Sequence, residues 1–311
     1  MRAYAVGEAP RIAIAAPSFA VDPARLETGR RALETAGYAC CARYDLLDAD
    51  GYLAGSDARR ADELMQWVGD PDVDAIVCAR GGYGAARLFA RLEPECFADA
   101  RKPLVGYSDV TALLLWQRAR ADGLIGIHGP MFDAEAGPTA EELDRVGRLL
   151  RGEPVAPLEG EGGRGGSAEG PLVGGSLTLV TNSLGTDWEI DTDGAILMLE
   201  EIGERPYALD RHLQHLADAG KLDAAAGFGI GHLVGCTDPK RDLPTALDVM
   251  RDTLAATGKP IVWGLPFGHQ SPNLAWPVGA RGRIDGDAAR VEVLEAAVEP
   301  RPAPTVGEDN R

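Results

Sequence analysis

The 311-residue chain has a formal net charge of −17 and a pI near 4.7, with 45% hydrophobic and 25% charged residues. This composition is typical of a folded globular protein, and a norm of roughly 150 residues per domain indicates two domains. The acidic balance argues against a nucleic-acid partner, because such binding depends on clustered lysine and arginine. It also disfavours an anionic membrane surface. No apolar run approaches the roughly 20 residues that span a bilayer, so we expect a soluble protein.

The cysteines and the N-terminus bear on the compartment. The first 20 residues lack a basic segment and a small-residue cleavage site, so no export signal is predicted. The five cysteines are scattered and form no C-x-x-C pair, which fits a reducing compartment better than a disulfide framework. We therefore expect a cytoplasmic location. The cysteines are Cys40, Cys41, Cys78, Cys96 and Cys236.

The first half of the chain alternates apolar runs with amphipathic stretches. This rhythm predicts a parallel, doubly wound sheet with right-handed crossovers. In chain order, we expect strands at residues 11–17, 38–44, 74–80, 103–107 and 123–128. The helices among them are expected at residues 23–36, 58–68, 84–92 and 109–120.

Residues 151–170 are rich in Gly, Pro and Glu and have no apolar periodicity, which predicts a flexible linker between domains at residues 1–150 and 171–298. No apolar strand precedes these glycines and no Gly-Lys-Ser/Thr follows them, which argues against a phosphate-binding loop. The second domain is again mixed α/β. Residues 299–311 are Pro-rich and charged, so we expect a flexible tail. In the second domain, strands are expected at residues 195–199, 227–234, 260–264 and 291–294, and helices at 209–219 and 245–256.

A glycine-rich segment, Arg-Gly-Gly-Tyr-Gly at residues 80–84, follows an apolar strand and opens a helix. Ligands of doubly wound sheets bind at the carboxyl ends of the strands, and glycines let backbone N–H groups approach a substrate oxygen closely. The segment half-resembles a dinucleotide fingerprint, but Arg87 stands where a third small residue is expected. A tight turn without a ligand is the other interpretation.

Ser108 lies in Gly-Tyr-Ser-Asp at residues 106–109, between an apolar strand and a helix. A serine lifted out of a sheet at a helix N-terminus has the geometry of a nucleophile elbow. Val110 replaces the second glycine of that motif. Ser108 and Asp109 are equally suited to cap the helix that follows, so the nucleophile interpretation and the helix-cap interpretation both stay open.

A serine nucleophile needs a base within hydrogen-bond reach, and the chain has five histidines. His212 and His215 lie one helical turn apart, a zinc-binding spacing, but no third ligand is evident and solvated helix histidines are favoured. His128 and His232 end apolar strands, where a histidine usually bonds to the backbone. His269 lies in a polar loop after a predicted strand, which favours it as the base.

The base in turn needs an acidic partner to hold its tautomer. Residues 197–204 end an apolar strand in three carboxylates, of which Glu200 comes first. Glu201 points to the opposite side if the extended geometry continues. Spacing alone does not select Glu200, because solvated glutamates are the common alternative.

Six short motifs occur in order over nearly the whole chain: Ala-Arg-Gly-Gly-Tyr-Gly (79–84), Gly-Tyr-Ser-Asp (106–109), His-Gly-Pro-Met (128–131), Gly-Gly-Ser-Leu (174–177), Leu-Glu-Glu-Ile-Gly-Glu-Arg-Pro-Tyr (199–207) and Gly-His (268–269). Together they resemble the LD-carboxypeptidase family of serine peptidases, which includes muramoyltetrapeptide carboxypeptidases and microcin C self-immunity peptidases. The resemblance implies Ser108 as nucleophile, with Glu200 and His269 completing a Ser-Glu-His triad.

The resemblance also implies an oxyanion hole formed by backbone N–H groups, which we assign to Gly82 and Asp109. We assign substrate contacts to Tyr83 and Trp188. The indole of Trp188 suits stacking on a flat group, and simple packing is the alternative.

The fold implied by the resemblance is an N-terminal flavodoxin-like domain and a C-terminal swivelling β/α domain, with the active site between them. A homodimer is expected, and no metal or organic cofactor. The implied reaction removes the terminal D-alanine from murein tetrapeptides during cytoplasmic cell-wall recycling. One alternative is a microcin-type peptidase acting on a peptidyl-nucleotide. An alternative of another class is a non-catalytic protein that binds a nucleotide or sugar through residues 81–84.

Overall fold

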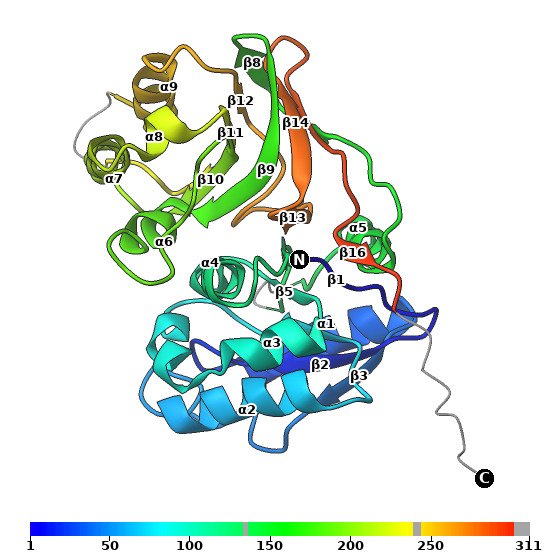
Figure 1. The fold of residues 1–311 in the computed structure, drawn as a ribbon. Helices are drawn as coiled ribbons and strands as arrows, with labels where there is room; N and C mark the ends of the chain where they lie inside the picture. Colours follow the sequence, from blue (N-terminus) through cyan, green and yellow to red (C-terminus); the bar gives the residue numbers. More distant parts are fainter. Residues whose placement is uncertain (133–135, 239–243, 302–311) are drawn as a thin grey trace.

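The computed structural model describes residues 1–132, 136–238 and 244–301. These residues form two lobes, each built on its own sheet, which lie one above the other in Figure 1. The N-terminal lobe holds a six-stranded sheet and the C-terminal lobe an eight-stranded sheet. Both have helices beside them, so the predicted α/β fold class is confirmed. Residues 302–311 of the predicted tail lie outside the described residues.

The N-terminal sheet contains all five strands predicted for the first half of the chain. They pair in parallel in the order β3-β2-β4-β5-β6, which is the flavodoxin-like order 2-1-3-4-5. The order reverses between β2 and β4, so the loops after these strands diverge and leave room for a site. The strands are β2 (Arg11–Ala15), β3 (Ala39–Ala42), β4 (Ala75–Cys78), β5 (Leu104–Gly106) and β6 (Gly126–His128).

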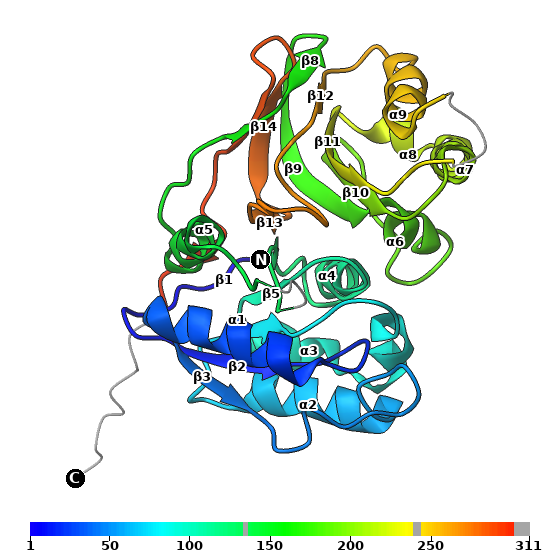
Figure 2. The ribbon, with the colours of Figure 1, turned by 180° about the vertical axis from the view of Figure 1, so that it is seen from behind.

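The helices of this lobe begin at recognisable caps and lie on both faces of the sheet (Figures 1 and 2). The Asp22 side chain accepts from two backbone N–H groups at the start of α1, and Pro23 fills the first helical position. The predicted helix at 84–92 is instead a 3₁₀ helix, η1, and two helices were not predicted, α3 and α5. The elements are α1 (Pro23–Thr35), α2 (Asp57–Gly69), η1 (Ala85–Arg91), α3 (Pro94–Ala100), α4 (Val110–Arg120) and α5 (Ala140–Arg151).

The C-terminal sheet has the order β7-β15-β14-β9-β10-β11-β12-β8. Its centre, β9 to β12, is parallel, and antiparallel strands flank it on both sides. The strands are β7 (Leu158–Glu159), β8 (Gly162–Arg164), β9 (Ser167–Ser176), β10 (Ile196–Ile202), β11 (Gly227–Val234), β12 (Ile261–Trp263), β14 (Arg281–Asp285) and β15 (Arg290–Val293). The helices are α6 (Leu177–Asn182), α7 (Pro206–Asp218), α8 (Lys221–Ala224) and α9 (Ala246–Ala255).

Two pairings tie the lobes together. β13 (Trp276–Val278) leaves the C-terminal half and adds an antiparallel edge strand to the N-terminal sheet, beside β6. β1 (Ala3–Tyr4) pairs with β16 (Val298–Glu299), so the two ends of the described chain lie together. The C-terminal lobe is therefore not a simple block of residues 171–298, because residues 276–278 belong to the other sheet.

The segment 151–170, predicted to be a flexible linker, contains β7, β8 and the start of β9. Its glycines allow close packing: a Cβ on Gly163 would collide with the carbonyl oxygen of Gly286, and one on Gly162 would lie 2.7 Å from the ring of Trp263. The glycine content did not predict these strands, because glycine has two uses. It loosens an exposed chain, and it also lets two backbones approach where no side chain fits.

This packing predicts that Gly163→Ala lowers the free energy of unfolding by about 1–3 kcal/mol, because the added methyl group meets backbone atoms. Gly7→Ala is the matched control, since a Cβ there meets nothing within 4 Å. Urea denaturation of both variants and the parent measures the difference. Equal midpoints for all three proteins would support the linker interpretation instead.

Candidate active site

Ser108 lies in the turn between β5 and α4 with φ of +58°, a left-handed conformation that few non-glycine residues adopt. Such strain persists only where the surroundings enforce it, and it clusters at functional sites. A Cβ on Gly81 would lie 2.8 Å from the Ser108 Oγ, and one on Gly106 would lie 2.7 Å from the side chain of Val110. The small residues that this turn requires are therefore Gly106 before it and Gly81 on the neighbouring loop.

Asp109 does not cap α4 with its side chain. Its buried carboxylate instead accepts from the Ser18 hydroxyl at 2.6 Å and from the Ala85 N–H at 2.8 Å. Burial raises the pKa of Asp109, and these two hydrogen bonds oppose that rise. One carboxylate thus joins the loops that follow β2, β4 and β5, which is where the strand order reverses.

A buried arginine holds the glycine-rich loop after β4 through hydrogen bonds. The guanidinium of Arg60 donates to the carbonyl oxygens of Gly84, at 2.9 Å, and Pro17. Gly82 has φ of +103° and lies directly against the ring of Phe19, so no side chain fits there. These contacts hold the loop in one conformation, as an oxyanion hole requires. The oxyanion roles of Gly82 and Asp109 stay predictions.

Glu200 and His269 are brought together by the C-terminal lobe. Glu200 lies near the end of β10, fully buried, and its Oε2 lies 2.7 Å from the His269 Nδ1. Gly268 has φ of +114°, and a Cβ there would lie 2.8 Å from the same carboxylate oxygen. The contact fixes the orientation of the imidazole; with the Nδ1 proton donated to Glu200, Nε2 is the nitrogen able to accept another proton.

Glu201 faces the other side of β10, as the alternation of a strand predicts. Its carboxylate accepts from the Thr178 N–H at 2.8 Å and the Ile202 N–H at 2.9 Å. Burial raises the pKa of Glu201, and these bonds oppose the rise. Its partners are the first turn of α6 and its own strand, so Glu201 organises the backbone and Glu200 contacts the histidine.

The lobes meet beside the nucleophile turn. The ring of Tyr107 packs edge-on against the ring of His269 at 4.9 Å. One helical turn after Ser108, the Thr111 Oγ1 accepts from the Ser176 N–H at 3.2 Å, and Ser176 pairs in register with Glu200. This contact explains the second glycine of the Gly-Gly-Ser-Leu motif, because a Cβ at position 175 would lie 2.5 Å from the Thr111 hydroxyl.

The histidine loop is also anchored to α5, a helix that the sequence did not predict. The Asn273 Oδ1 accepts from the Gly268 N–H at 3.0 Å. The Glu142 Oε1 accepts from the Asn273 N–H at 2.6 Å and the Ser271 hydroxyl at 3.1 Å. Sequence reasoning missed Glu142 and Asn273. The available signal for Glu142 was its place in a Thr-x-x-Glu capping box with Thr139.

His128 is fully buried behind the nucleophile turn and stacks on Trp276 at 5.0 Å, with Tyr107 and Phe267 around it. Neither ring nitrogen has a hydrogen-bond partner in the described structure, so the expected backbone partner was wrong. At the end of β6, the His128 ring packs against other aromatic rings and does not bond to a backbone carbonyl. Burial lowers the pKa of His128 to about 3, and the nearby His269 adds to the shift.

The remaining histidines are His212, His215 and His232. His232 is half-buried, its Nδ1 has no hydrogen-bond partner among the described residues, and burial lowers its pKa. His212 on α7 is half-buried with its pKa lowered by burial, and His215 is exposed. Within residues 1–132, 136–238 and 244–301, no three His, Cys, Asp or Glu side chains gather as metal ligands.

The two predicted substrate contacts differ in exposure. Tyr83 is 48% exposed at the surface of the glycine-rich loop. Trp188 is only 8% exposed and packs edge-on against Phe89 at 5.4 Å, so its surroundings fit simple packing. Both substrate roles stay predictions.

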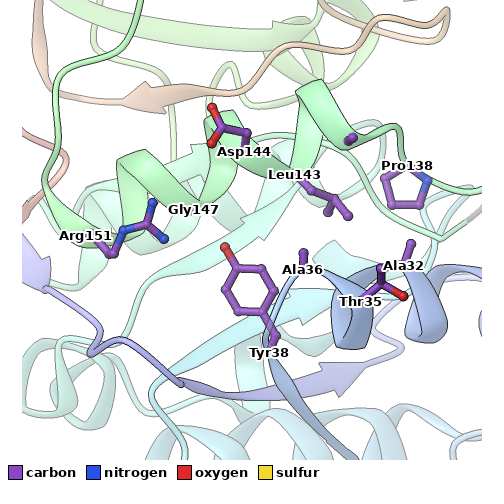
Figure 3. A pocket seen from close by; sticks show the side chains of 10 residues that line it. Ala32, Thr35, Ala36, Tyr38, Pro138, Leu143, Asp144, Gly147 and Arg151 are labelled. Atoms are coloured by element: carbon purple, nitrogen blue, oxygen red, sulfur yellow. The ribbon is translucent and has the colours of Figure 1, made fainter.

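A cavity of about 500 Å³ lies between α1 and α5, away from this site (Figure 3). Its walls include Tyr38, Asp144 and Arg151, and it contains none of Ser108, Glu200 and His269. This cavity therefore does not mark the Glu200–His269 pair. No helix in the described part of the chain has the length and apolarity needed to span a membrane.

Comparison with known protein families shows that two parts of the chain match the two domains of one family. Residues 12–129 match the LD-carboxypeptidase N-terminal domain, and residues 169–284 match the LD-carboxypeptidase C-terminal domain.

Several relatives cover almost the whole chain. A probable murein peptide carboxypeptidase of Bacillus subtilis is 34% identical over 94% of this chain and 94% of its own. A murein tetrapeptide carboxypeptidase of Pseudomonas aeruginosa is 31% identical over 90% and 94%. The crystal structure of muramoyltetrapeptide carboxypeptidase from Oxalobacter formigenes has a TM-score of 0.82 at 27% identity, covering 91% and 97%. MccF in complex with glutamyl sulfamoyl guanosine has a TM-score of 0.87, covering 96% and 99%, and its 21% identity supports the shared fold alone.

The neutral, buried His128 predicts an acid-sensitive contribution to stability. The ordinary histidine pKa is near 6.5, so between about pH 6.5 and 3 the unfolded chain holds a proton that the folded chain does not. The free energy of unfolding should therefore fall as pH falls through this window, by up to about 1.4 kcal/mol per pH unit. His128→Phe keeps the ring stack and removes the titration, so its stability should fall less. Denaturation of both proteins from pH 7 to 4 measures this, and parallel curves would contradict it.

Proposed function

The chain belongs to the LD-carboxypeptidase family, and from that premise we propose that it is a serine carboxypeptidase that releases the terminal D-alanine from murein tetrapeptides. The observation that carries the proposal is the 2.7 Å contact between Glu200 and His269. The carboxylate comes from β10 and the imidazole from the loop after β12. The His269 ring also packs against Tyr107, the residue that precedes Ser108.

In the proposed reaction the Ser108 Oγ attacks the carbonyl carbon that precedes the D-residue, while the His269 Nε2 takes the hydroxyl proton. Glu200 stabilises the imidazolium through Nδ1. The tetrahedral oxyanion is bound by the backbone N–H groups of Gly82 and Asp109. His269 then returns its proton to the leaving amine of D-alanine, and water hydrolyses the acyl-enzyme with His269 as base.

The relatives support murein peptides as the substrate class, since those with high coverage and identity above 30% include proteins named for murein peptides. A peptidyl-nucleotide substrate of the microcin type has weaker support, because the MccF likeness is one of fold. The buried position of Trp188 also offers little ring surface to a nucleobase. The Glu200–His269 pair and the carboxypeptidase relatives favour an enzyme over a non-catalytic binding protein.

We further propose that the enzyme works in the cytoplasm as a homodimer. The five cysteines are all unpaired, which fits a reducing compartment. The dimer rests on the family resemblance, and light scattering of the purified protein measures it.

Replacing the nucleophile gives the first test of this function. Ser108→Ala should reduce release of D-alanine from a murein tetrapeptide by roughly 10⁴-fold or more, because the attacking oxygen is gone. Mass spectrometry of the tripeptide product measures turnover. Ser167→Ala, an exposed serine at the start of β9, is the control and should keep the parent rate. Parent-like turnover by Ser108→Ala would refute the nucleophile.

The adjacent glutamates form a matched pair for a second test. Glu200→Gln should lower kcat at least about a hundredfold, because the amide no longer stabilises the imidazolium. Glu201→Gln should mainly lower stability, by about 1–3 kcal/mol, since it weakens bonds to the Thr178 and Ile202 N–H groups. Steady-state kinetics and thermal unfolding of both variants separate the effects. A larger loss of kcat in Glu201→Gln would reverse the assignment.

A further inference from the structure

Three aromatic rings from three loops meet beside the glycine-rich loop. Phe19 follows β2, Tyr52 lies between β3 and α2, and Tyr83 follows β4. The ring of Tyr52 lies 5.2 Å from that of Phe19 and 6.1 Å from that of Tyr83. Tyr52 is 57% exposed and Tyr83 48%, so two neighbouring rings present apolar surface to solvent. Single exposed aromatics are common, whereas a contiguous pair next to a reactive centre is typical of a binding surface.

These rings are fixed to the nucleophile turn by backbone contacts. The Phe19 N–H donates to the Gly81 carbonyl oxygen at 3.2 Å, and the Ala20 N–H donates to the Tyr52 carbonyl oxygen at 2.9 Å. Gly82 lies against the Phe19 ring, and Gly81 abuts the Ser108 side chain. The platform, defined here as Tyr52 and Tyr83, therefore holds a set position relative to Ser108.

Charged side chains around the platform are already engaged. The Arg80 guanidinium lies 5.6 Å from the centre of the Phe19 ring and donates to the Ala20 carbonyl oxygen at 2.7 Å. The Arg87 guanidinium forms two hydrogen bonds with Asp57, each 2.8 Å long. The surface left for a ligand is consequently the two phenol rings, which suits a group with a flat apolar face and hydroxyl groups.

We propose that Tyr52 and Tyr83 form a subsite that stacks on the sugar ring of a muramoyl-bearing peptide, an inference that rests on the proposed function. A carboxypeptidase acting on a muramoyltetrapeptide has three residues between the cleaved bond and the sugar, and an extended chain of three residues spans at most about 11 Å. The Tyr83 Cα lies within about 7.6 Å of the Gly81 Cα, two peptide units along the chain, and its side chain extends further. The two lengths are comparable, so an extended peptide whose scissile carbonyl lies at Ser108 can carry its sugar to the platform.

The test compares two substrates that differ only in the sugar, a muramoyltetrapeptide and the free tetrapeptide of the same sequence. The quantity measured is the ratio of their kcat/KM values. This ratio should fall roughly threefold to tenfold in Tyr52→Ala and in Tyr83→Ala, because each removes one stacking ring. Tyr83→Phe keeps the ring and should keep most of the ratio. Tyr44→Ala, which removes a 98% exposed tyrosine outside the platform, is the matched control and should leave the ratio at the parent value.

A binding measurement that needs no turnover separates this inference from the proposed function. Calorimetric titration of the parent and of Tyr52→Ala/Tyr83→Ala with muramoyltripeptide and free tripeptide should show a sugar preference in the parent that the double variant loses. Equal affinities of the parent for the two peptides, or an unchanged preference in the double variant, would overturn the subsite. Failure to cleave either tetrapeptide would overturn the proposed function instead.

Discussion

The buried contact between the Glu200 carboxylate and the His269 imidazole is the constraint on which the rest of the site depends. A fully buried carboxylate is costly unless it is paired; among the described residues the Glu200 Oε2 contacts His269, and Oε1 has no hydrogen-bond partner. The loop that delivers this partner needs glycine at position 268, where φ is positive and a Cβ would meet the carboxylate. Asn273 and Glu142 then fix the loop to α5, so a helix of the first half of the chain positions a histidine of the second.

The serine side of the site is built on the opposite principle, strain held in place by neighbours. Ser108 has a left-handed backbone, and Gly81 leaves space for its side chain. The Asp109 carboxylate joins the three loops at the carboxyl edge of the N-terminal sheet. The two sides meet through the contact of Thr111 with the strand beside Glu200 and through the ring contact of Tyr107 with His269. The proposed catalysis therefore depends on the contacts that hold the two lobes in register.

Local sequence patterns predicted the strands of the first sheet better than the long-range contacts that hold the site together. Apolar periodicity predicted β2 to β6, and position in a turn or loop made Ser108 and His269 candidates, because both signals are local. The motif resemblance singled out Glu200, which spacing alone did not separate from Glu201. Other features depend on contacts between residues far apart in the chain. The packing of Gly163, the return of Trp276 to the first sheet and the anchoring by Glu142 leave no periodic signal. The environment of His128 was mistaken because a ring stack and a backbone partner leave the same sequence pattern.

The central claim is that an imidazole from one lobe activates a hydroxyl from the other, and covalent labelling tests it most directly. The intact protein is treated with a serine-directed phosphonylating reagent, and the adduct is mapped by mass spectrometry. The account predicts a single adduct on Ser108, and a labelling rate that drops sharply in His269→Ala while the fold is retained. Absence of an adduct on Ser108, or labelling that is equally fast without His269, would contradict the account.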